Sequence, residues 1–467
     1  MKTFDFKTYL SPLTWRYGSE KMRYIFSEEN KYKLWRKIWV ALAESEHKHG
    51  LVSKEELDDL KENENNLDIN RILEIEQDTK HDVVAAIAEF AEKASKGGGK
   101  IHLGATSMDI VDNADMMRIQ EAITIIENKL LNLLQIFAAQ IEDNIDFTCL
   151  GYTHLQPAEP TTVGYRLSLY AQDLQTDYEI LQFVKKTIKA KGFKGAVGTG
   201  ASYLALLGGG RMDSSEVGEF EKEIMKSLCI DSVLISGQVY PRKFDYLVMV
   251  ILASIASSIA KFAADLRILQ TPAIGEWSEP FGKKQVGSSA MPFKKNPLNS
   301  EKICSLARYI NSLPSVALEN ASLSHLERTL DDSANKRIFI PEGFLAVDEI
   351  LETAIKIVQG LVINKERIKF NLKQYGPFAA TESIIIEAVK AGANRQEIHE
   401  LLRTISLQAW EQIQKGVQNP MDKLLTTNDI LLKYLKIEKI KKLLDISNHI
   451  GDAPERAKKL VDKIKLL

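Results

Sequence analysis

The stretch MMRIQEAITIIENKLLNLLQIFAAQI, residues 116–141, decides the fold class of this chain. Its apolar residues recur three and four positions apart over about seven turns, which is the spacing of one face of an α-helix. These residues are Ile119, Ile123, Ile126, Leu130, Leu133, Leu134, Phe137 and Ile141. A helix this long, with one apolar side, indicates a large helical bundle.

Further long helical patterns lie on the C-terminal side of this stretch. They cover residues 164–190, 244–270, 300–320 and 342–363. No series of alternating strand segments bounded by turns accompanies them. The uncharged stretch 246–260 is shorter than the roughly 20 residues that cross a bilayer, so we interpret it as a helix buried on all sides. The sequence therefore predicts an all-α protein with an elongated central bundle.

The two ends of the chain differ from its centre. Residues 1–107 hold shorter helical patterns, with an acidic stretch at 54–59 and a glycine run at 97–99. Residues 364–467 also form shorter helical patterns and end rich in lysine. We predict an N-terminal helical domain over 1–107, a central bundle of long helices over 108–363, and a C-terminal helical domain over 364–467.

The bulk composition is that of a soluble globular protein. The 467 residues are 45% apolar and 27% charged, and 61 basic against 63 acidic residues leave a net charge of −2. This balance predicts neither a nucleic-acid nor a membrane partner. Three cysteines without paired spacing, Cys149, Cys229 and Cys304, indicate reduced thiols. The N-terminus has no apolar signal core, so we expect a cytoplasmic protein.

Three loops between the helical patterns gather small and polar residues: 104–107, 151–154 and 287–297. The third combines Gly287-Ser288-Ser289 with Lys294 and Lys295, and Asn296-Pro297 then leads into a helix. Backbone N–H groups, hydroxyls and an ammonium can close on an anion. A glycine-serine hinge capped by lysines explains the same residues equally well, and the residues alone do not identify a reaction.

The order of residues 287–297, G-S-S-x-M-P-x-K-x-N-P, resembles the signature loop of the fumarase/aspartase superfamily. That resemblance implies β-elimination with release of fumarate, on a homotetrameric helical bundle. Four further segments, together with Trp15-Arg16-Tyr17, resemble the adenylosuccinate lyase family within it. These segments are Lys80–Val84, His102–Asp109, Tyr152–Thr162 and Leu326–Arg337. The resemblance keeps the same order from about residue 12 to 403, and the form Thr-Leu-Asp-Asp-Ser is closer to the animal type than to the short bacterial type.

The family implies two succinylated substrates, adenylosuccinate and the succinylaminoimidazole carboxamide ribotide (SAICAR), and it implies no cofactor and no metal. Elimination removes a Cβ proton beside a carboxylate and protonates the departing nitrogen. Negative charge builds up on that carboxylate in the process. The site therefore needs a base, an acid, and donors aimed at the developing charge.

By resemblance, Ser288 is the base, and Lys294 with the loop amides would help it to lose its proton. His154 is the general acid, since its pKa can lie near working pH, and Glu301 is its carboxylate partner. His81 completes the predicted catalytic set. The plainer interpretations are a loop-stabilising hydroxyl for Ser288, a capping or packed histidine for His154, an exposed helix glutamate for Glu301, and a polar cluster at a helix N-terminus for His81.

Further residues match substrate-contact positions of the family. They are Arg16, Tyr17, Lys80, His81, Asp82, Thr106, Ser107, Gln238, Ser289, Asn296, Lys302, Arg328, Ser333 and Arg337. The arginines suit phosphate oxygens, Thr106 and Ser107 a succinyl carboxylate, and Asp82 could orient His81. Lys295 and Lys302 stand where the animal-type pattern has arginine, and Phe293 where it has tyrosine. Lysine loses the bidentate fork, which weakens the assignment of Lys302.

Other interpretations stay open. Another lyase of the superfamily, such as argininosuccinate lyase, fumarase or a carboxymuconate cycloisomerase, would share the loop, although the arginines of 328–337 favour a phosphorylated substrate. A crystallin-like structural protein or a plain helical scaffold would not need Ser288, Lys294 and His154. The stretch 195–200 mimics a dinucleotide loop but lacks a preceding strand, and 208–211 is no Walker loop. The histidines show no zinc spacing. The family also implies a homotetramer whose active sites form from three subunits.

Overall fold

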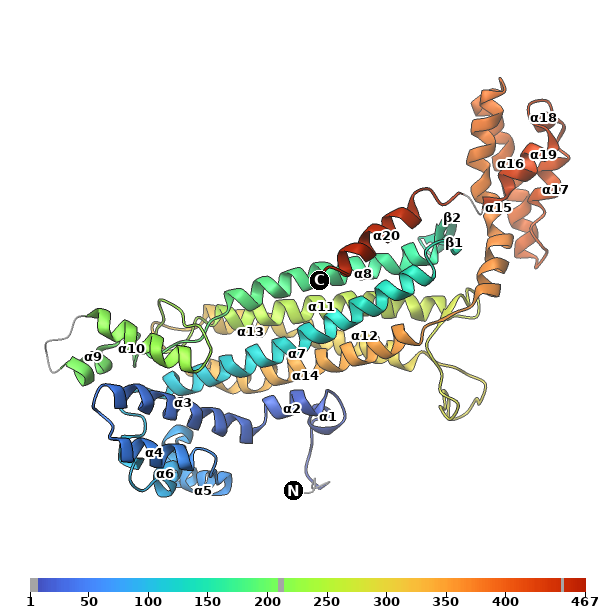
Figure 1. Ribbon diagram of the computed structural model, residues 1–467. Coiled ribbons are helices and arrows are strands. Elements are labelled where there is room, and N and C mark those ends of the chain that lie inside the picture. The colour runs from blue at the N-terminus through green and yellow to red at the C-terminus, as the bar shows by residue number, and fades with distance from the viewer. Residues whose placement is uncertain (1–6, 209–213, 447–448) are drawn as a thin grey trace. The chain divides into compact units, whose positions relative to one another are not determined.

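The computed structural model describes residues 7–208, 214–446 and 449–467, and helices dominate it (Figure 1). The fraction of helical residues is 67%, which confirms the all-α prediction. The last three residues of the rejected Walker-like stretch, 209–211, lie outside the described residues.

The helices follow one another along nearly the whole chain (Figure 1). The N-terminal ones are α1 (Pro12–Trp15), α2 (Glu20–Ile25), α3 (Glu28–Lys48), α4 (Lys54–Asn63), α5 (Ile69–Thr79), α6 (Asp82–Lys93) and the short 3-10 helix η1 (Gly98–Lys100). The central ones are α7 (Ser107–Asp143), α8 (Val163–Thr187), α9 (Ala201–Gly208), α10 (Ser214–Ser227), α11 (Lys243–Leu269), α12 (Leu298–Ile310), α13 (Leu313–Ser322) and α14 (Asp332–Gln359). The C-terminal ones are α15 (Lys365–Lys390), α16 (Arg395–Gln414), α17 (Met421–Thr426), α18 (Asp429–Leu432), α19 (Ile437–Leu444) and α20 (Ala453–Ile464).

Helix α7 contains the stretch 116–141, and all eight of its periodic apolar residues are buried. Helix α11 contains the stretch 246–260, but it is not buried on all sides in the single chain, because Val250 is 37% exposed and Ser257 is exposed as well. By length and composition α7 and α11 are the two described helices that could cross a membrane. The core helix of a water-soluble protein meets the same criterion, so this finding is weak evidence for a membrane.

The chain divides into two compact units, each built from several segments. Unit 1 comprises Met1–Leu130, Asp177–Ser257 and Ser305–Glu352, and unit 2 comprises Leu131–Thr176, Ser258–Cys304 and Thr353–Leu467. Unit 1 has an aromatic core around Trp35, Trp39 and Phe90. In unit 2 the helices from α15 to α19 enclose an aliphatic cluster that includes Ile384, Leu402 and Leu425. The three predicted domains, with boundaries at 107/108 and 363/364, stay a prediction.

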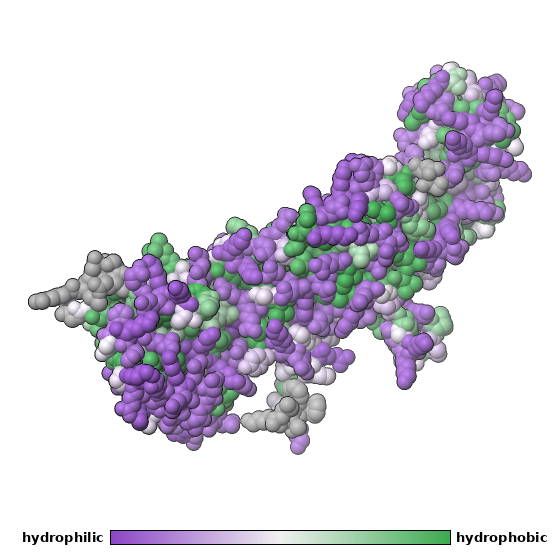
Figure 2. All heavy atoms as spheres, viewed as in Figure 1, coloured by the Kyte–Doolittle hydropathy of each residue, from purple (hydrophilic) through white to green (hydrophobic). Residues whose placement is uncertain are grey.

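Hydrophilic side chains cover the N-terminal helices α4, α5 and α6 (Figure 2). This agrees with the acidic stretch at 54–59, where α4 buries Leu57 and Leu60 and turns its charged residues outward. Its N-terminus carries a capping box formed by Ser53 and Glu56. The acidic stretch is therefore a solvated helix face.

Residues 151–154, expected to form a loop between helices, belong to a β-hairpin instead. Strand β1 (Thr148–Thr153) pairs antiparallel with β2 (Gln156–Thr162). A second small sheet joins β3 (Trp277–Ser278) to β4 (Val362–Ile363). The hairpin was missed because β2 contains Pro157 and Pro160, which argue against a strand in a single sequence.

Candidate active site

Residues with positive φ mark the segments that the sequence had singled out. Apart from glycines, the described residues in this left-handed region are Lys80, His102, His154, Leu155, Cys229 and Leu326. All but Cys229 lie in the segments that carry the family resemblance. Such conformations cost on the order of 1 kcal/mol or more each, and they gather at functional sites. The strained backbone positions thus point to the same segments as the sequence motifs do.

His154 stands at the tip of the β1–β2 hairpin. Thr153 pairs with Gln156, so His154 and Leu155 alone form the turn, with φ angles of 52° and 59°. Two positive φ angles are typical of a type I′ turn, which asparagine and glycine ordinarily occupy. The imidazole is exposed, and no described residue forms a hydrogen bond or ion pair with it. The hairpin therefore presents an imidazole that can meet a substrate, as a general acid must.

The loop of residues 279–297, here called the lid loop, joins β3 to α12 and contains the predicted base. Figure 1 shows it in yellow, extending away from helix α12, which follows it. Ser289 and Lys294 are exposed, whereas Ser288 is half-buried. The Ser288 hydroxyl oxygen accepts the N–H of Met291 at 3.1 Å and that of Ala290 at 3.4 Å. Donors aimed at an oxygen stabilise negative charge on it, and a serine that acts as a base needs this stabilisation of its alkoxide.

The lid loop closes on itself at its neck. Asn296 Nδ2 donates to the carbonyl of Gly287 at 2.9 Å, and Gln270 Nε2 donates to the carbonyl of Lys295 at 2.8 Å. A Cβ on Gly287 would lie 2.1 Å from the carbonyl oxygen of Lys294, so the close approach of two backbone segments requires glycine here. Asn296 holds the neck in this chain, and its predicted contact with substrate stays a prediction.

Helix α12 follows the lid loop and carries Glu301 and Lys302 in its first turns. The buried carboxylate of Glu279 caps this helix, because it accepts the N–H of Ser300 at 2.5 Å and that of Asn299 at 3.3 Å. A carboxylate at a helix N-terminus satisfies unpaired N–H groups and the helix dipole. Glu279 therefore fixes the point at which the lid loop meets the helix.

Glu301 and His154 are not joined within one chain. The carboxylate of Glu301, which is 49% exposed, lies 4.0 Å from Arg267 Nη2. Among the described contacts none connects it to His154. The predicted pairing of acid and carboxylate is thus not formed by the two residues of a single chain.

The strip Lys80-His81-Asp82 forms the junction of α5 and α6. Lys80 ends α5 with a φ of 58°, and His81 caps α6 by accepting the Val84 N–H on Nδ1 at 3.5 Å. Arg337 Nη2 donates to Asp82 Oδ2 at 3.1 Å, which brings two predicted site segments together. His81 Nδ1 lies 3.6 Å from Asp82 Oδ1, too far for a hydrogen bond. Arg337, rather than His81, therefore holds Asp82 in this chain.

Thr106 and Ser107 stand at the N-terminus of the long helix α7, where N–H groups and the helix dipole favour a carboxylate. Asp109 lies behind them and is fully buried. Its carboxylate accepts the Thr106 N–H at 3.0 Å and the Tyr203 hydroxyl at 2.9 Å, and it forms an ion pair with the buried ammonium of Lys191. Asp109 thus fixes the turn that presents Thr106 and Ser107.

A buried charge cluster underlies the segment 328–337. Arg242 Nε donates to Asp332 Oδ2 at 2.6 Å, and the Arg242 guanidinium also donates to Asp112 at 3.2 Å. Lys336 donates to Asp115 at 2.9 Å. Asp332 is the first residue of α14, so the cluster fixes the helix start on which Ser333 and Arg337 stand.

Arg328 has an unused donor. Its Nη1 is buried without a hydrogen-bond partner among the described residues, and the nearest carboxylate oxygen, Asp332 Oδ1 at 3.8 Å, also lacks one. Burial lowers the pKa of Arg328 from its ordinary value, although the guanidinium stays charged. A desolvated guanidinium with an open donor suits an anionic ligand.

The backbone of Gln238 contacts the residue that precedes Arg328. Its N–H donates to the carbonyl of Glu327 at 3.0 Å. A Cβ on Gly237 would lie 2.6 Å from that same oxygen. The two chain segments therefore touch directly beside Arg328, and glycine permits the contact.

Arg16 and Tyr17 follow α1. The Arg16 guanidinium lies 5.7 Å from the centre of the Trp15 ring and is exposed. The N–H of Ser19 donates to Asp348 at 2.7 Å, which ties this segment to α14, the helix of Ser333 and Arg337.

The sequence identifies the groups that would face a substrate but not the buried groups that hold them. Asp109 and Arg242 are at most 4% exposed. Charged residues are almost never fully buried unless paired, and a single sequence does not tell a buried charge from a solvated one. Their place in the sequence could have pointed to them, because Asp109 lies inside a predicted segment and Arg242 lies shortly after Gln238.

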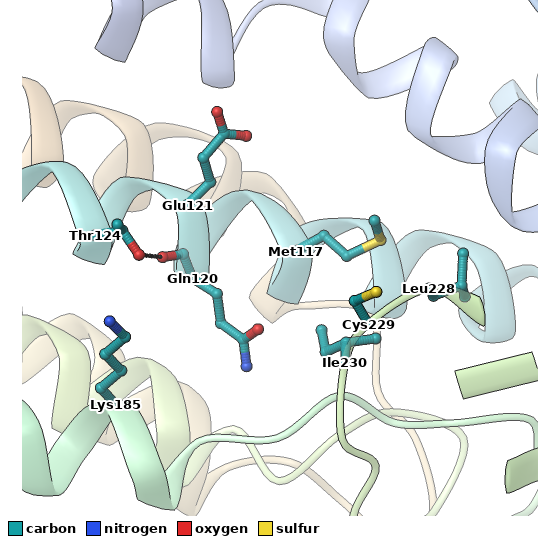
Figure 3. Close-up of a pocket in the computed structure, with 8 residues that line it drawn as sticks. All are labelled: Met117, Gln120, Glu121, Thr124, Lys185, Leu228, Cys229 and Ile230. Carbon is teal, nitrogen blue, oxygen red and sulfur yellow. Dashed lines mark hydrogen bonds between the residues drawn. The ribbon is translucent and has the colours of Figure 1, made fainter. Parts of the chain in front are cut away.

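A pocket of about 350 Å³ lies elsewhere in unit 1 (Figure 3). Its lining comes from α7, α8 and the segment 228–230 (Figure 3). The lining residues are Met117, Gln120, Glu121, Thr124, Lys185, Leu228, Cys229 and Ile230. None of them is a predicted site residue, so this pocket is separate from the candidate active site.

Comparisons with known proteins define the class. The family described as Lyase matches residues 16–311. The fold is similar to that of a fumarate lyase from Mesorhizobium sp. BNC1, with a TM-score of 0.82 and 22% identity over 95% of this chain and 98% of that one. It is also similar to that of the 3-carboxy-cis,cis-muconate lactonizing enzyme from Pseudomonas putida, with a TM-score of 0.86 and 21% identity over 97% and 99%. Fold and family together define a lyase.

More specific matches follow. The family described as adenylosuccinate lyase C-terminus matches residues 377–460. The chain is 38% identical to the adenylosuccinate lyase of Saccharomyces cerevisiae over 98% of this chain and 95% of the relative, and 35% identical to that of Pyrococcus abyssi over 97% and 98%. The chain belongs to the adenylosuccinate lyase family, which confirms the resemblance seen in the sequence, and it is a carbon–nitrogen lyase.

Proposed function

We propose that this chain catalyses β-elimination of fumarate from adenylosuccinate, giving AMP, and from SAICAR, giving the aminoimidazole carboxamide ribotide AICAR. The observation that carries the proposal is the Ser288 hydroxyl, which accepts two backbone N–H groups in an exposed lid loop of a chain of this family. A hydroxyl in that setting can act as a base once the loop closes on an anionic substrate. The protein would work in the cytoplasm and without a cofactor.

The proposed reaction assigns one task to each group. Ser288 first gives its own proton to water and becomes an alkoxide, whose charge the two N–H groups and Lys294 stabilise. The alkoxide then removes the Cβ proton and becomes a hydroxyl again, and the electron pair left on Cβ forms a carbanion that the neighbouring carboxylate stabilises. That pair then forms the carbon–carbon double bond of fumarate as the carbon–nitrogen bond breaks. His154 gives its proton to the departing nitrogen. Ser289 and Lys294 in the lid loop, with Thr106 and Ser107 at the α7 N-terminus, bind the two carboxylates of the succinyl group.

The nucleotide phosphate would bind among the cationic groups of unit 1. Arg328 offers the unused Nη1 donor, and Arg337 and Ser333 follow on the first turns of α14. Arginine forks suit phosphate oxygens, and the buried cluster around Arg242 holds this segment in place. An argininosuccinate or malate substrate would not need these cations.

We further propose that the working form is a homotetramer with active sites shared between chains. The lack of a contact between His154 and Glu301 within one chain supports this, since another chain would supply the partner. Helix α8 supports it as well, because Leu169 is 54% exposed, Ile180 42% and Phe183 65%. Large exposed apolar side chains in a row are typical of interfaces.

The deciding experiment incubates the purified protein separately with adenylosuccinate, argininosuccinate and malate, and follows fumarate and AMP. We expect turnover of adenylosuccinate alone among the three. Turnover of argininosuccinate or malate without turnover of adenylosuccinate would overturn the assignment.

A second experiment tests the shared site. Ser288→Ala and His154→Ala chains are purified, unfolded, mixed and refolded together. We expect each variant alone to be inactive and the mixture to recover part of the wild-type rate, because some sites then receive both intact residues. Refolded wild-type protein is the control for recovery, and inactive mixtures beside active refolded wild type would contradict the shared site.

A further inference from the structure

The hairpin that carries His154 is weak by itself. Its strand β2 contains Pro157 and Pro160, which cannot donate to the ladder, and the pairing is irregular between Leu150 and Tyr152. An isolated two-stranded hairpin is marginally stable in water, and the strained turn at His154 weakens it further. Something outside the hairpin must therefore hold it.

The anchor is the fully buried carboxylate of Glu276. Its Oε1 accepts the Tyr152 hydroxyl at 2.9 Å and Asn371 Nδ2 at 3.0 Å, and its Oε2 accepts Arg166 Nη1 at 3.1 Å. Arg166 also donates to the carbonyl of Leu150 in the hairpin. One carboxylate thus joins β1 to helices α8 and α15 within unit 2.

Tyr152 is the link between this anchor and the acid. It lies in β1 two residues before His154, at the end of the strand that leads into the turn. Burial, together with Glu276, raises the pKa of Tyr152 well above its ordinary value, so the hydroxyl keeps the proton that it donates. The Arg166 guanidinium lies 5.7 Å from the centre of the Tyr152 ring and limits its movement.

We propose that Glu276 is a positioning residue for the reaction. Acting through Tyr152 and Arg166, it fixes the position and orientation of the hairpin tip that presents His154. The inference rests on the proposed role of His154 as the acid. A proton donor must lie within hydrogen-bond reach of the atom that it protonates, and a displacement of about 1 Å can cost on the order of 100-fold in rate. Loosening the anchor should therefore lower kcat more than it changes KM.

Tyr152→Phe tests this with the smallest change, since it removes one hydroxyl and leaves the Arg166–Glu276 pair intact. We expect kcat for adenylosuccinate to fall about 10-fold with KM within about 2-fold, because only alignment is lost. Tyr170→Phe is the matched control. Tyr170 is a buried tyrosine of unit 2 that donates to a different carboxylate, Asp265, at 2.8 Å, and no described hydrogen bond joins it to Glu276 or to the hairpin. The control should keep its kcat within about 2-fold.

Glu276→Gln is the stronger variant, because it leaves the buried Arg166 guanidinium without its carboxylate. We expect it to lose about 100-fold in kcat and to unfold at a lower temperature than wild type. Glu276→Gln could lose activity because it does not fold. The test of the positioning role is therefore Tyr152→Phe, and thermal unfolding is measured on both Tyr152→Phe and Tyr170→Phe.

The outcomes separate the two levels of the proposal. A Tyr152→Phe protein that keeps its kcat, or tyrosine variants that lose kcat to the same extent, would overturn the positioning role. Wild-type protein is assayed beside them, and its failure to release fumarate from adenylosuccinate would overturn the proposed function instead. A kcat loss confined to Tyr152→Phe, with both variants equally heat-stable, supports the inference.

Discussion

The predicted binding segments and the lid loop are held in opposite ways. In unit 1, Thr106 rests on the buried Asp109, and the segment 328–337 rests on the buried cluster around Arg242. In unit 2, the hydrogen bonds described for Ser288 come from N–H groups of its own loop, and Phe293 nearby is 83% exposed. Segments with few buried contacts open at low cost, whereas buried ion pairs fix geometry. With the proposed roles, this difference implies that the substrate contacts are in place before binding and that the proposed base moves into place afterwards.

The largest effect should come from the lid loop. Ser288→Ala should lower kcat by about 10³-fold, since it removes the proposed general base, and should leave the unfolding temperature unchanged because the loop contributes little to the fold. Steady-state kinetics and thermal unfolding measure the two quantities. Ser315→Ala is the control, because the hydrogen bond described for that hydroxyl also lies within its own turn, to the carbonyl of Ser312. A loss in activity matched by a loss in stability would show that the lid loop is part of the fold and does not open at low cost.

A change in the buried charge cluster around Arg242 should lower the free energy of unfolding. Arg242→Met leaves Asp112 and Asp332 without their shared cation, and breaking a buried pair destabilises by about 3–5 kcal/mol. Urea unfolding monitored by circular dichroism measures the loss. Arg71→Met is the control, because Arg71 binds Glu92 with two hydrogen bonds on the surface, and we expect little change there. Equal midpoints for the two variants would show that the cluster does not hold the binding segments.

Much of this arrangement could be predicted from the sequence. The period of the apolar residues in 116–141 predicted α7, because a helix of that length must bury a continuous stripe. The motifs contain five of the six non-glycine residues that have positive φ in the described part of the chain. The hairpin at His154 could not be predicted, because its prolines and its positive φ at Leu155 depend on tertiary anchors. The buried charges Asp109 and Glu276 were missed for a related reason, since burial is a property of the packed chain.

A third prediction concerns a buried carboxyl group near the core of unit 1. Glu46 in α3 is fully buried, neither of its oxygens has a hydrogen-bond partner among the described residues, and burial raises its pKa from 4.5 to about 8. Between these values the folded chain holds a proton that the unfolded chain releases. The contribution of Glu46 to stability is therefore greatest below pH 4.5 and falls as pH rises to about 8, by on the order of 3 kcal/mol between pH 5 and 8.

Glu46→Gln should remove this pH dependence and make the protein more stable than wild type at pH 8. Unfolding by urea at pH 5 and at pH 8 measures the difference. Glu28→Gln on the same helix is the control, because that carboxylate is 64% exposed and forms a surface ion pair with Lys31. If the free energy of unfolding changes with pH to the same extent in wild type and Glu46→Gln, Glu46 is ionised in the folded chain. Water would then reach this buried carboxylate.

The smallest effect tests whether the lid loop needs its shape as well as its serine. Gly287→Ala would place a Cβ 2.1 Å from the carbonyl oxygen of Lys294, so the neck must open. Gly282→Ala in the same loop is the matched control, since its Cβ would meet only the Gln285 side chain, at 3.7 Å. We expect Gly287→Ala to lower kcat about 10-fold without a change in unfolding temperature, because Ser288 is displaced while the core is untouched. Gly282→Ala should keep its rate. Equal kinetics for both variants would mean that closure reshapes the neck, and the geometry of the open loop would then play no part in placing the base.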